Sequence, residues 1–264
     1  MYCKMIRFMK KKLKAMLLGA IMMSGTVCTQ SCWMSFSDPS VRVIMGKAPE
    51  QAYIGCWSEV RETKDFKQIQ SKVPIDILFE QASDYKVVIE GNDTIARKLS
   101  TEVVHGCLTI DLEPGKYRNP LLRVKIYGPD VNSFETNSGS IIVKTDINLN
   151  DNLICRVTGS GNIEMMDVSA KSVDVSIFGS GDFDSGEISA KKLTVTIDGS
   201  GDVDLEKVDV TDKLVMSVSG SGNININGKA KNVEAKVFGS GDICGNLQSD
   251  SQSYTTYGSG EINL

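Results

Sequence analysis

Residues 193–205 read Leu-Thr-Val-Thr-Ile-Asp-Gly-Ser-Gly-Asp-Val-Asp-Leu, and this stretch holds the pattern that decides the fold. Apolar residues alternate with polar ones before the Gly-Ser-Gly tripeptide, and the alternation resumes after it. A period of two places the apolar side chains on one face of a β-strand. The tripeptide therefore marks a tight corner between two strands that bury the same face.

The tripeptide recurs along the C-terminal half as an internal repeat. Each copy is followed by a polar residue and then by an apolar one. The first copy is the degenerate Asn137-Ser138-Gly139, and the spacings from it onward are 22, 20, 20, 21, 19 and 19 residues. The six exact copies begin at Gly159, Gly179, Gly199, Gly220, Gly239 and Gly258.

Before each tripeptide, apolar residues occupy every second position. In the stretch quoted above these are Leu193, Val195 and Ile197, with the polar Thr196 between the last two. The alternation continues after the corner at Val203. Each repeat therefore predicts two strands with one buried face, and a further apolar pair near its middle indicates a third. Such pairs are Val168 with Ala170 and Ile188 with Ala190.

A period near 20 residues with parallel repetition suits a parallel β-helix, in which rungs stack about 4.8 Å apart. The expected fold is all-β: a right-handed parallel β-helix (solenoid) with rungs of about 20 residues and an irregular β-rich N-terminal half. Glycine suits the corner, because a tight turn requires positive φ and stacked corners leave no room for Cβ atoms. A β-propeller is the alternative, but its blades need about 40 residues.

The repeat divides the chain into regions. Residues 137–264 form the predicted Gly-Ser-Gly repeat β-helix, and residues 41–136 are a β-rich N-terminal part without the tripeptide, interpreted as continuous with it. A separate small β domain with a boundary near residue 130 is the open alternative. In the last copy, Gln252, Tyr254 and Thr256 replace the aliphatic residues of earlier copies, which predicts a capping rung.

The N-terminus predicts export. Residues 1–31 hold six basic side chains and no acidic one, and residues 15–27 form a nearly uncharged apolar run. This is the pattern of a signal peptide, and the run is shorter than the roughly 20 residues of a membrane-spanning helix. Without residues 1–31, 23 basic residues stand against 33 acidic ones, a net charge of −10. Phosphate backbones repel so acidic a chain, which argues against nucleic-acid partners.

The signal region ends at Thr29-Gln30-Ser31-Cys32, which places small residues at the third and first positions before a cysteine. The segment resembles a bacterial lipobox, in which the cysteine is lipidated, although Thr29 and Gln30 replace its usual residues. We therefore predict lipidation of Cys32 and a tether over residues 32–40. An ordinary secretory cleavage that leaves Cys32 as a free thiol is the alternative. No acidic run follows Cys32, so the periplasmic and surface sides both stay open.

Cysteine and histidine usage limits the chemistry. Cys56, Cys107, Cys155 and Cys244 lie beyond the predicted tether, without a C-x-x-C pair or a framework spacing. Isolated buried thiols are expected, although an even number in an exported protein also permits disulfides. The single histidine, His105, excludes histidine-rich zinc sites and the H-E-x-x-H metalloprotease motif.

Polar residues follow the glycines in one column, at Asn162, Asp182, Asp202, Asn223 and Asp242. We expect these side chains to cap backbone groups of a solvated turn. A calcium ladder is the alternative, but the nonapeptide calcium motif of β-rolls, with its period of nine, is absent. The sequence predicts no metal and no cofactor.

Paired carboxylates raise the possibility of an enzyme. Asp182 with Asp184, and Asp202 with Asp204, are pairs of the kind that glycan-cleaving enzymes use. However, a substrate site needs concavity, and rungs of 19 to 21 residues leave no long loops to wall a cleft. Regularly spaced acidic turns are more typical of a structural role, and no catalytic residue is predicted.

Aromatic residues precede the glycine corner at Phe178, Phe238 and Tyr257. Exposed rings at these positions would suit the face of a sugar or a protein partner. The simpler interpretation is that the rings lie across neighbouring strands and contribute to packing.

Gly-Ser-Gly followed by Asp or Asn and an apolar residue, repeated in an exported β-helical chain, resembles the bacterial head GIN domain family of autotransporter adhesin-like lipoproteins. The resemblance covers residues 137–264 and extends to leading strands at 65–69, 73–77, 85–89 and 106–110. It implies a β-helical, surface or periplasmic, adhesin-like protein with no established catalytic residues. Together with the lipobox and the aromatic residues, it predicts an exported, lipid-anchored, adhesin-like binding or structural protein of the cell envelope, without catalytic activity and with a glycan or a protein as its ligand. A β-helical enzyme that acts on polysaccharides through surface carboxylates is the alternative.

Overall fold

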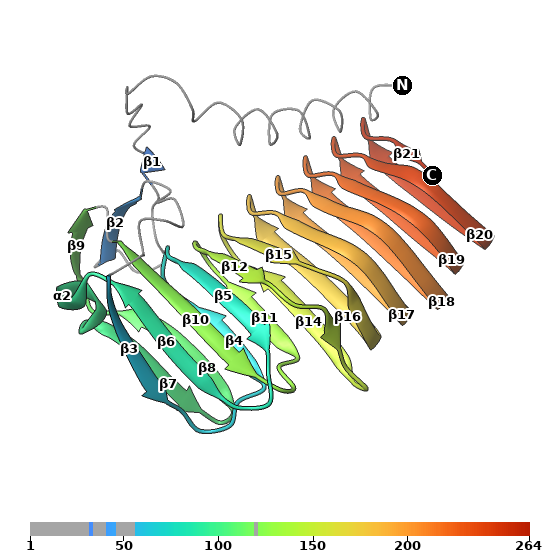
Figure 1. Ribbon diagram of the computed structural model, residues 1–264. Helices are drawn as coiled ribbons and strands as arrows, with labels where there is room; N and C mark the ends of the chain where they lie inside the picture. Colours follow the sequence, from blue (N-terminus) through green and yellow to red (C-terminus); the bar gives the residue numbers. More distant parts are fainter. Residues whose placement is uncertain (1–31, 34–40, 46–55, 119–120) are drawn as a thin grey trace, which may run out of the picture. The chain divides into compact units, whose positions relative to one another are not determined.

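The computed structural model describes residues 32–33, 41–45, 56–118 and 121–264. The predicted export signal and residues 34–40 of the predicted tether lie outside these residues. The described chain is nearly all-β, with one short helix, and its parallel coils stack into a β-solenoid of about seven turns (Figure 1). The predicted fold class is therefore confirmed. Within this part of the chain, no helix has both the length and the apolar character that crossing a membrane requires.

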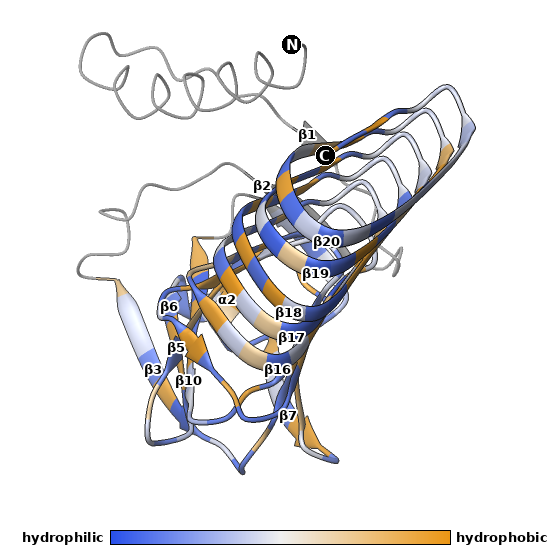
Figure 2. Ribbon diagram, turned by 90° about the vertical axis from the view of Figure 1, so that its right-hand side faces the viewer, coloured by the Kyte–Doolittle hydropathy of each residue, from blue (hydrophilic) through white to orange (hydrophobic). Residues whose placement is uncertain are grey.

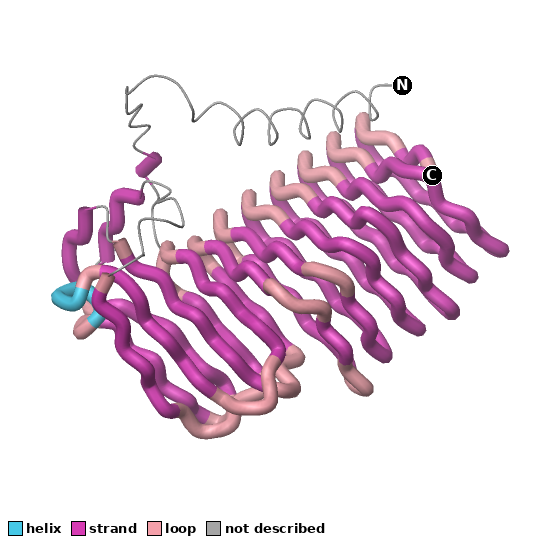
Figure 3. Tube along the Cα trace, viewed as in Figure 1, coloured by secondary structure: helices cyan, strands magenta, loops and turns pink. Residues whose placement is uncertain are grey.

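Five long strands form the regular part of the solenoid (Figure 3). Four of them each fill one interval between glycine corners, whereas the first, Val168–Gly179, shares its interval with the shorter strand Asn162–Met165. The four longer strands bend along their length and stay paired with the neighbouring rungs apart from short register shifts, so in these intervals one strand replaces the two or three that the sequence predicts. All neighbouring pairs are parallel, and Val195 lies opposite Val175 on one side and Met216 on the other. The strands are β16 (Val168–Gly179), β17 (Phe183–Gly199), β18 (Val203–Gly220), β19 (Ile224–Gly239) and β20 (Ile243–Gly258).

Aliphatic columns fill the interior, with one residue contributed by each rung. Val175, Val195, Met216 and Ala235 form one such column, and all four are buried. Hydrophobic and hydrophilic residues alternate along the rungs (Figure 2). The period-two assignment of these strands is therefore confirmed, because the residues predicted to point inward are the ones that the neighbouring rungs cover.

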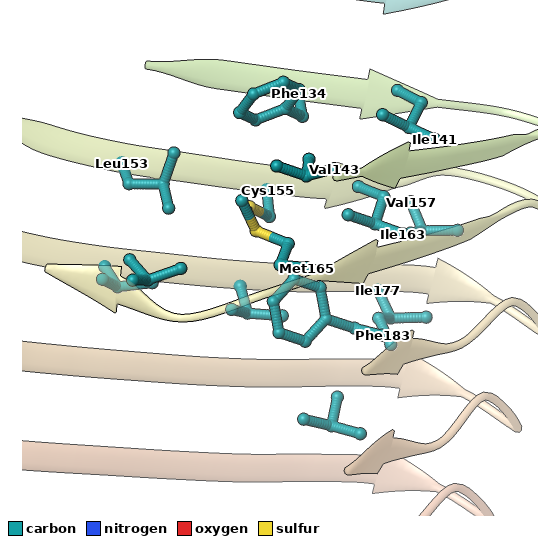
Figure 4. Packing of buried hydrophobic residues seen from close by; sticks show 14 of the residues in the cluster. Phe134, Ile141, Val143, Leu153, Cys155, Val157, Ile163, Met165, Ile177 and Phe183 are labelled. Carbon is teal, nitrogen blue, oxygen red and sulfur yellow. The ribbon is translucent and has the colours of Figure 1, made fainter. Parts of the chain in front are cut away.

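Larger side chains fill the interior towards the N-terminal half. Phe79 and Phe134 meet edge to face, with ring centroids 5.1 Å apart. Figure 4 shows Cys155, Met165 and Phe183 on successive layers, turned into the same interior. The Cys155 thiol donates to the Met165 sulfur at 3.5 Å, and burial raises the pKa of this thiol. These residues close the space between the repeat rungs and the preceding layers.

Shorter strands continue both sides of the stack into the N-terminal half. On one side β14 pairs with β11 and β11 with β4; on the other, β15 pairs with β12 and β12 with β5, all in parallel. A short strand β13 pairs with the start of β16. The bounds are β4 (Gln68–Ser71), β5 (Asp76–Gln81), β11 (Ser133–Thr136), β12 (Ser140–Val143), β13 (Ile147–Asn148), β14 (Asn152–Val157) and β15 (Asn162–Met165).

Antiparallel strands end the stack on the N-terminal side. Strand β10 pairs in parallel with β5 but antiparallel with β6, which pairs antiparallel with β3. On the other side β8 pairs in parallel with β4 and antiparallel with β7. The sequence did not predict this change of direction. The bounds are β3 (Trp57–Glu62), β6 (Lys86–Gly91), β7 (Leu99–Val104), β8 (Cys107–Leu112) and β10 (Leu122–Gly128).

Local turns explain how this end is built. His105 and Gly106 both have positive φ, +50° and +77°, as the two-residue turn between β7 and β8 requires. Helix α2 (Asp93–Ala96) begins after Asn92, whose side-chain oxygen accepts from the Thr94 N–H at 3.0 Å. A separate small sheet joins β1 (Cys32–Trp33), β2 (Val41–Met45) and β9 (Gly115–Arg118).

The two glycines of a corner differ in backbone conformation but share the same crowding. From Gly179 onward the first glycine has positive φ, for example +143° at Gly199, whereas φ of the second, as at Gly201, lies outside this region. A Cβ atom on either glycine would overlap a carbonyl oxygen of the rung below, that of Gly179 for Gly199 and that of Gly181 for Gly201. The expectation of positive φ is therefore correct for the first glycine from Gly179 onward and wrong for the second, where crowding between rungs alone excludes a side chain.

The prediction of isolated buried thiols holds only in part. Cys155 is a free thiol in the interior, whereas Cys244 is buried but disulfide-bonded, so the prediction of an isolated thiol is wrong for Cys244. Cys107 is free but only half-buried, and Cys56 is half-buried too. The prediction that these two thiols are buried was wrong. Cys107 begins β8 on its less buried face, and Cys56 directly precedes β3, so the interior does not cover either residue.

Candidate binding surface

The polar column after the glycines is a hydrogen-bonded ladder that climbs the solenoid. The side-chain oxygen of Asn162 accepts from the Asp182 backbone N–H at 3.0 Å, and the Asp182 carboxylate accepts from the Asp202 N–H at 3.0 Å. The same step recurs from Asp202 to Asn223 and from Asn223 to Asp242, again at 3.0 Å. Each side chain thus caps a backbone donor of the next rung that the corner would otherwise leave unpaired.

The paired carboxylates are bound into the same contacts between rungs. The Asn223 amide donates to the Asp202 carboxylate at 2.9 Å, and the Asn225 amide donates to the Asp204 carboxylate at 2.8 Å. All four side chains are half-buried. Among the described residues, no group of three or more His, Cys, Asp or Glu side chains is arranged to hold a metal ion. The geometry is that of a structural ladder.

The aromatic column lies on the outside of the strand that leads into the corner. Phe178, Phe238 and Tyr257 are 44%, 43% and 64% exposed. Phe238 and Tyr257 stack across β19 and β20, with ring centroids 5.3 Å apart and planes only 10° from parallel. Phe178 is separated from them along the column by Asp198 and Ser219. The stacked pair is therefore confined to the last two rungs.

The last rung completes this surface. Gln252, Tyr254 and Thr256 lie in register with the buried Val233, Ala235 and Val237, yet all three are exposed. They are exposed because no complete rung of the described chain covers β20. The predicted capping rung is confirmed, and it brings Tyr254, 37% exposed, to the same end of the stack as Tyr257. Tyr254 was not predicted to be a surface residue, although a tyrosine in an otherwise aliphatic column is the signal that marks it.

Charged clusters in the N-terminal half were also missed, because their members are far apart in sequence. The Glu90 carboxylate accepts from Arg123 at 2.6 Å and from Lys125 at 2.7 Å. Burial opposes the charge of Glu90, but these two hydrogen bonds outweigh it and lower the pKa of its carboxyl group. Because the pairs join β6 to β10, they stabilise the antiparallel layer and present no carboxylate free for catalysis.

A second cluster fixes the loop before β11. The Tyr85 hydroxyl donates to the Asp130 carboxylate at 2.6 Å, and Lys67 lies 3.0 Å from the same carboxylate. Burial, and then the hydrogen bond to Asp130, raise the pKa of Tyr85 to about 12. The hydrogen bonds from Tyr85 and Lys67 lower the pKa of Asp130. These groups hold the loop in place.

The fold and this surface define a class: a parallel β-solenoid with exposed aromatic and hydroxyl-bearing side chains at its last rungs. Residues 65–243 and 184–264 match the family model described as "Putative auto-transporter adhesin, head GIN domain", and the chain belongs to this family. The resemblance inferred from the Gly-Ser-Gly repeat is therefore confirmed. No curated protein matches the chain.

Solved structures share the fold. A protein described as a putative adhesin from Bacteroides fragilis has a TM-score of 0.68 and 20% identity, over 78% of this chain and 95% of its own. A second, from Parabacteroides distasonis, has a TM-score of 0.68 and 19% identity, over 79% and 96%. A third, described as a putative lipid binding protein from Parabacteroides distasonis, has a TM-score of 0.65 and 21% identity, over 78% and 95%. At sequence identities this low, the similarity shows a shared fold.

Proposed function

We propose that this chain is an exported, lipid-anchored, adhesin-like binding or structural protein of the bacterial outer membrane, without catalytic activity. One observation carries the proposal. Asp202 and Asp204, which belong to the carboxylate pairs that would serve an enzyme, accept hydrogen bonds from the rung above them, and Asp182 does the same. Family membership supports an adhesin-like role, and the basic and apolar segments of residues 1–31 support export.

Lipidation of Cys32 would attach the chain at one end of the stack. Cys32 begins β1, which pairs with β2, and β2 pairs with β9 in the N-terminal half. Strand β20 lies at the opposite end of the row of strands (Figure 1). An anchored solenoid of this order would carry its last rungs away from the membrane, which is where a binding surface is most accessible to a partner.

Mass spectrometry of the membrane fraction tests the anchor. The expected result is a chain that begins at a diacylated or triacylated Cys32, with Cys32→Ser shifted to the soluble fraction. Cys107→Ser serves as the matched control, because it removes a half-buried thiol elsewhere. An unmodified Cys32, or a start at another residue, would remove the anchor from the proposal while leaving the solenoid unaffected.

A paired binding and turnover screen tests the absence of catalysis. The acidic chain should bind neutral glycans or surface proteins in preference to anionic polymers. Acidic polysaccharides should not be cleaved, and Asp182→Asn with Asp184→Asn should leave binding unchanged. Turnover that this double variant abolishes would instead support the polysaccharide-cleaving enzyme. Absence of binding to every glycan and surface protein would contradict the adhesin-like role.

A further inference from the structure

Strand β20 is an open edge. It pairs with β19 along its whole length, but on its other side only Ile243 and Cys244 have partners, in β21 (Ile262–Asn263). Residues 245–258 therefore present a row of backbone N–H and C=O groups that no other described strand pairs. Natural proteins usually protect such edges with charged residues, proline or a bulge, because an open edge is a template for another strand.

This edge lacks that protection. Between Ile243 and Gly258 the only charged residue is Asp250, whereas β17, β18 and β19 contain five, six and four charged residues. No proline lies in β20. The edge strand is therefore the long strand with the fewest charged residues, whereas edge protection would require more of them. Glu234 and Lys236 of β19 lie opposite the uncharged Ser253 and Thr255 of β20. Depletion of charge together with exposed tyrosines is the composition of the core of a protein interface.

The opposite end of the stack is also an edge, but it is charged and crosslinked. Strand β3 is an antiparallel edge that carries Glu59, Arg61 and Glu62. The Arg61 guanidinium reaches across the end of the solenoid and donates to the carbonyl oxygens of Leu99 at 2.6 Å and Ala96 at 3.1 Å. Head-to-tail stacking of copies would have to place β20 against this charged and crosslinked end. Self-association through β20 is therefore restricted to contact between two identical open ends.

We propose that β20 pairs edge to edge with β20 of a second copy of this chain, and so forms a closed, two-fold symmetric dimer through the C-terminal ends of two solenoids. The contact is isologous, because each copy offers the same surface, and symmetry makes the paired strands antiparallel. This proposal identifies a second copy of the chain as a partner, and it rests on the adhesin-like function proposed above. Two anchored chains joined in this way would link the surfaces that carry them.

The strand pattern defines the register. Residues that lie opposite each other in an antiparallel pair share a face of the sheet. The two-fold axis must therefore lie level with one residue of the strand, so that this residue is opposite its own copy. Centred on Tyr254, the register pairs residues 251–257 of the two copies completely. Opposite residues are then Gln252 with Thr256, Ser253 with Thr255, and Ser251 with Tyr257. Hydroxyl and amide side chains meet in every pair, and no charge is buried.

Sedimentation velocity of residues 32–264, which contain the hydrophobic core of the described chain, tests the dimer. The parent should shift from monomer to dimer between about 1 µM and about 1 mM, the range of weak protein affinities. Added sodium chloride should not raise the dissociation constant, because the contact itself is uncharged and salt screens the repulsion between two acidic copies. Ser253→Lys with Thr255→Lys places like charges opposite each other and should weaken the dimer about tenfold or more.

The matched control places the same two lysines inside the stack. Thr194 and Thr196 occupy the same outward columns on β17, so Thr194→Lys with Thr196→Lys should leave the dimer intact. Thermal melts confirm that both variants fold. A parent that stays monomeric at about 1 mM, or a dimer that both double variants weaken equally, overturns the proposal. If the parent stays monomeric and binds a neutral oligosaccharide, and if the Ser253→Lys with Thr255→Lys variant loses this binding, the C-terminal end is a carbohydrate-binding surface instead. The lipid and glycan tests above are read independently of this assay.

Discussion

At the residue scale, the glycine corners combine two separate steric requirements. Gly199 adopts φ of +143°, a conformation that L side chains rarely take. Gly201 has an ordinary φ, but a side chain there would meet the Gly181 carbonyl and the Ile177 side chain of the rung below. The same contacts recur at each corner, so the tripeptide is required by the stacking of backbones and not by a ligand.

Alanine substitution separates the two requirements. Gly106 has φ of +77° with nothing near a Cβ atom, so Gly106→Ala should cost only the conformational strain, about 1 to 2 kcal/mol. Gly201→Ala should cost more, about 3 kcal/mol or above, because the rungs must separate to admit the methyl group. The free energies of unfolding in urea provide the comparison. Equal costs would show that crowding between rungs contributes little.

The polar ladder makes a prediction about calcium. Asp202→Asn should change the free energy of unfolding by less than about 0.5 kcal/mol, because an amide oxygen can accept the Asn223 N–H as the carboxylate does. Asp202→Ala should cost about 1 kcal/mol, since the acceptor is lost. Melting temperatures should be the same with calcium and with chelator. A large calcium shift that disappears in Asp202→Asn would reinstate the calcium ladder.

At the element scale, the alternation along β17 decides which substitutions the solenoid tolerates. Val195 is fully buried between Val175 and Met216. Val195→Asp should therefore cost about 4 kcal/mol or more, because it buries an unpaired charge between stacked rungs. Thr196→Asp, one residue along on the outer face, should cost less than about 1 kcal/mol. Denaturant melts that show equal losses would mean that β17 has been assigned the wrong face.

At the scale of the whole molecule, the repeat rungs form a nearly one-dimensional stack in which each rung contacts its neighbours. Deletion of residues 183–202 removes one complete rung and brings Val203 into the place of Phe183. This variant should fold and melt cooperatively at a lower temperature, because columns and corners stay aligned. Deletion of residues 183–192 keeps the alternation but displaces the corner by half a rung, and should abolish cooperative melting. Circular dichroism during heating distinguishes the two results, and loss of structure in both would contradict independent stacking of rungs.

The repeat fold was predictable because the contacts that define it repeat along the chain. Every rung from residue 137 onward presents the same corner and the same alternation, so the contact between two rungs appears in the sequence as a spacing near 20 residues. The inward columns follow from this spacing alone, and the polar residues Gln252 and Thr256 mark the last rung. The family resemblance rests on the same residues.

Only the tertiary structure decided the rest. The antiparallel layer that ends the stack depends on contacts such as Arg61 with Leu99 and Arg123 with Glu90, which occur once and leave no period to detect. That Gly199 and not Gly201 has positive φ depends on the path of the backbone through the corner, which the tripeptide itself does not specify. The exposure of Tyr254 depends on how little of the described chain pairs with β20 beyond β19. A sequence repeat reveals interactions that recur from one rung to the next. At the two ends of the stack this recurrence stops, so the surfaces there are determined by contacts that each occur only once.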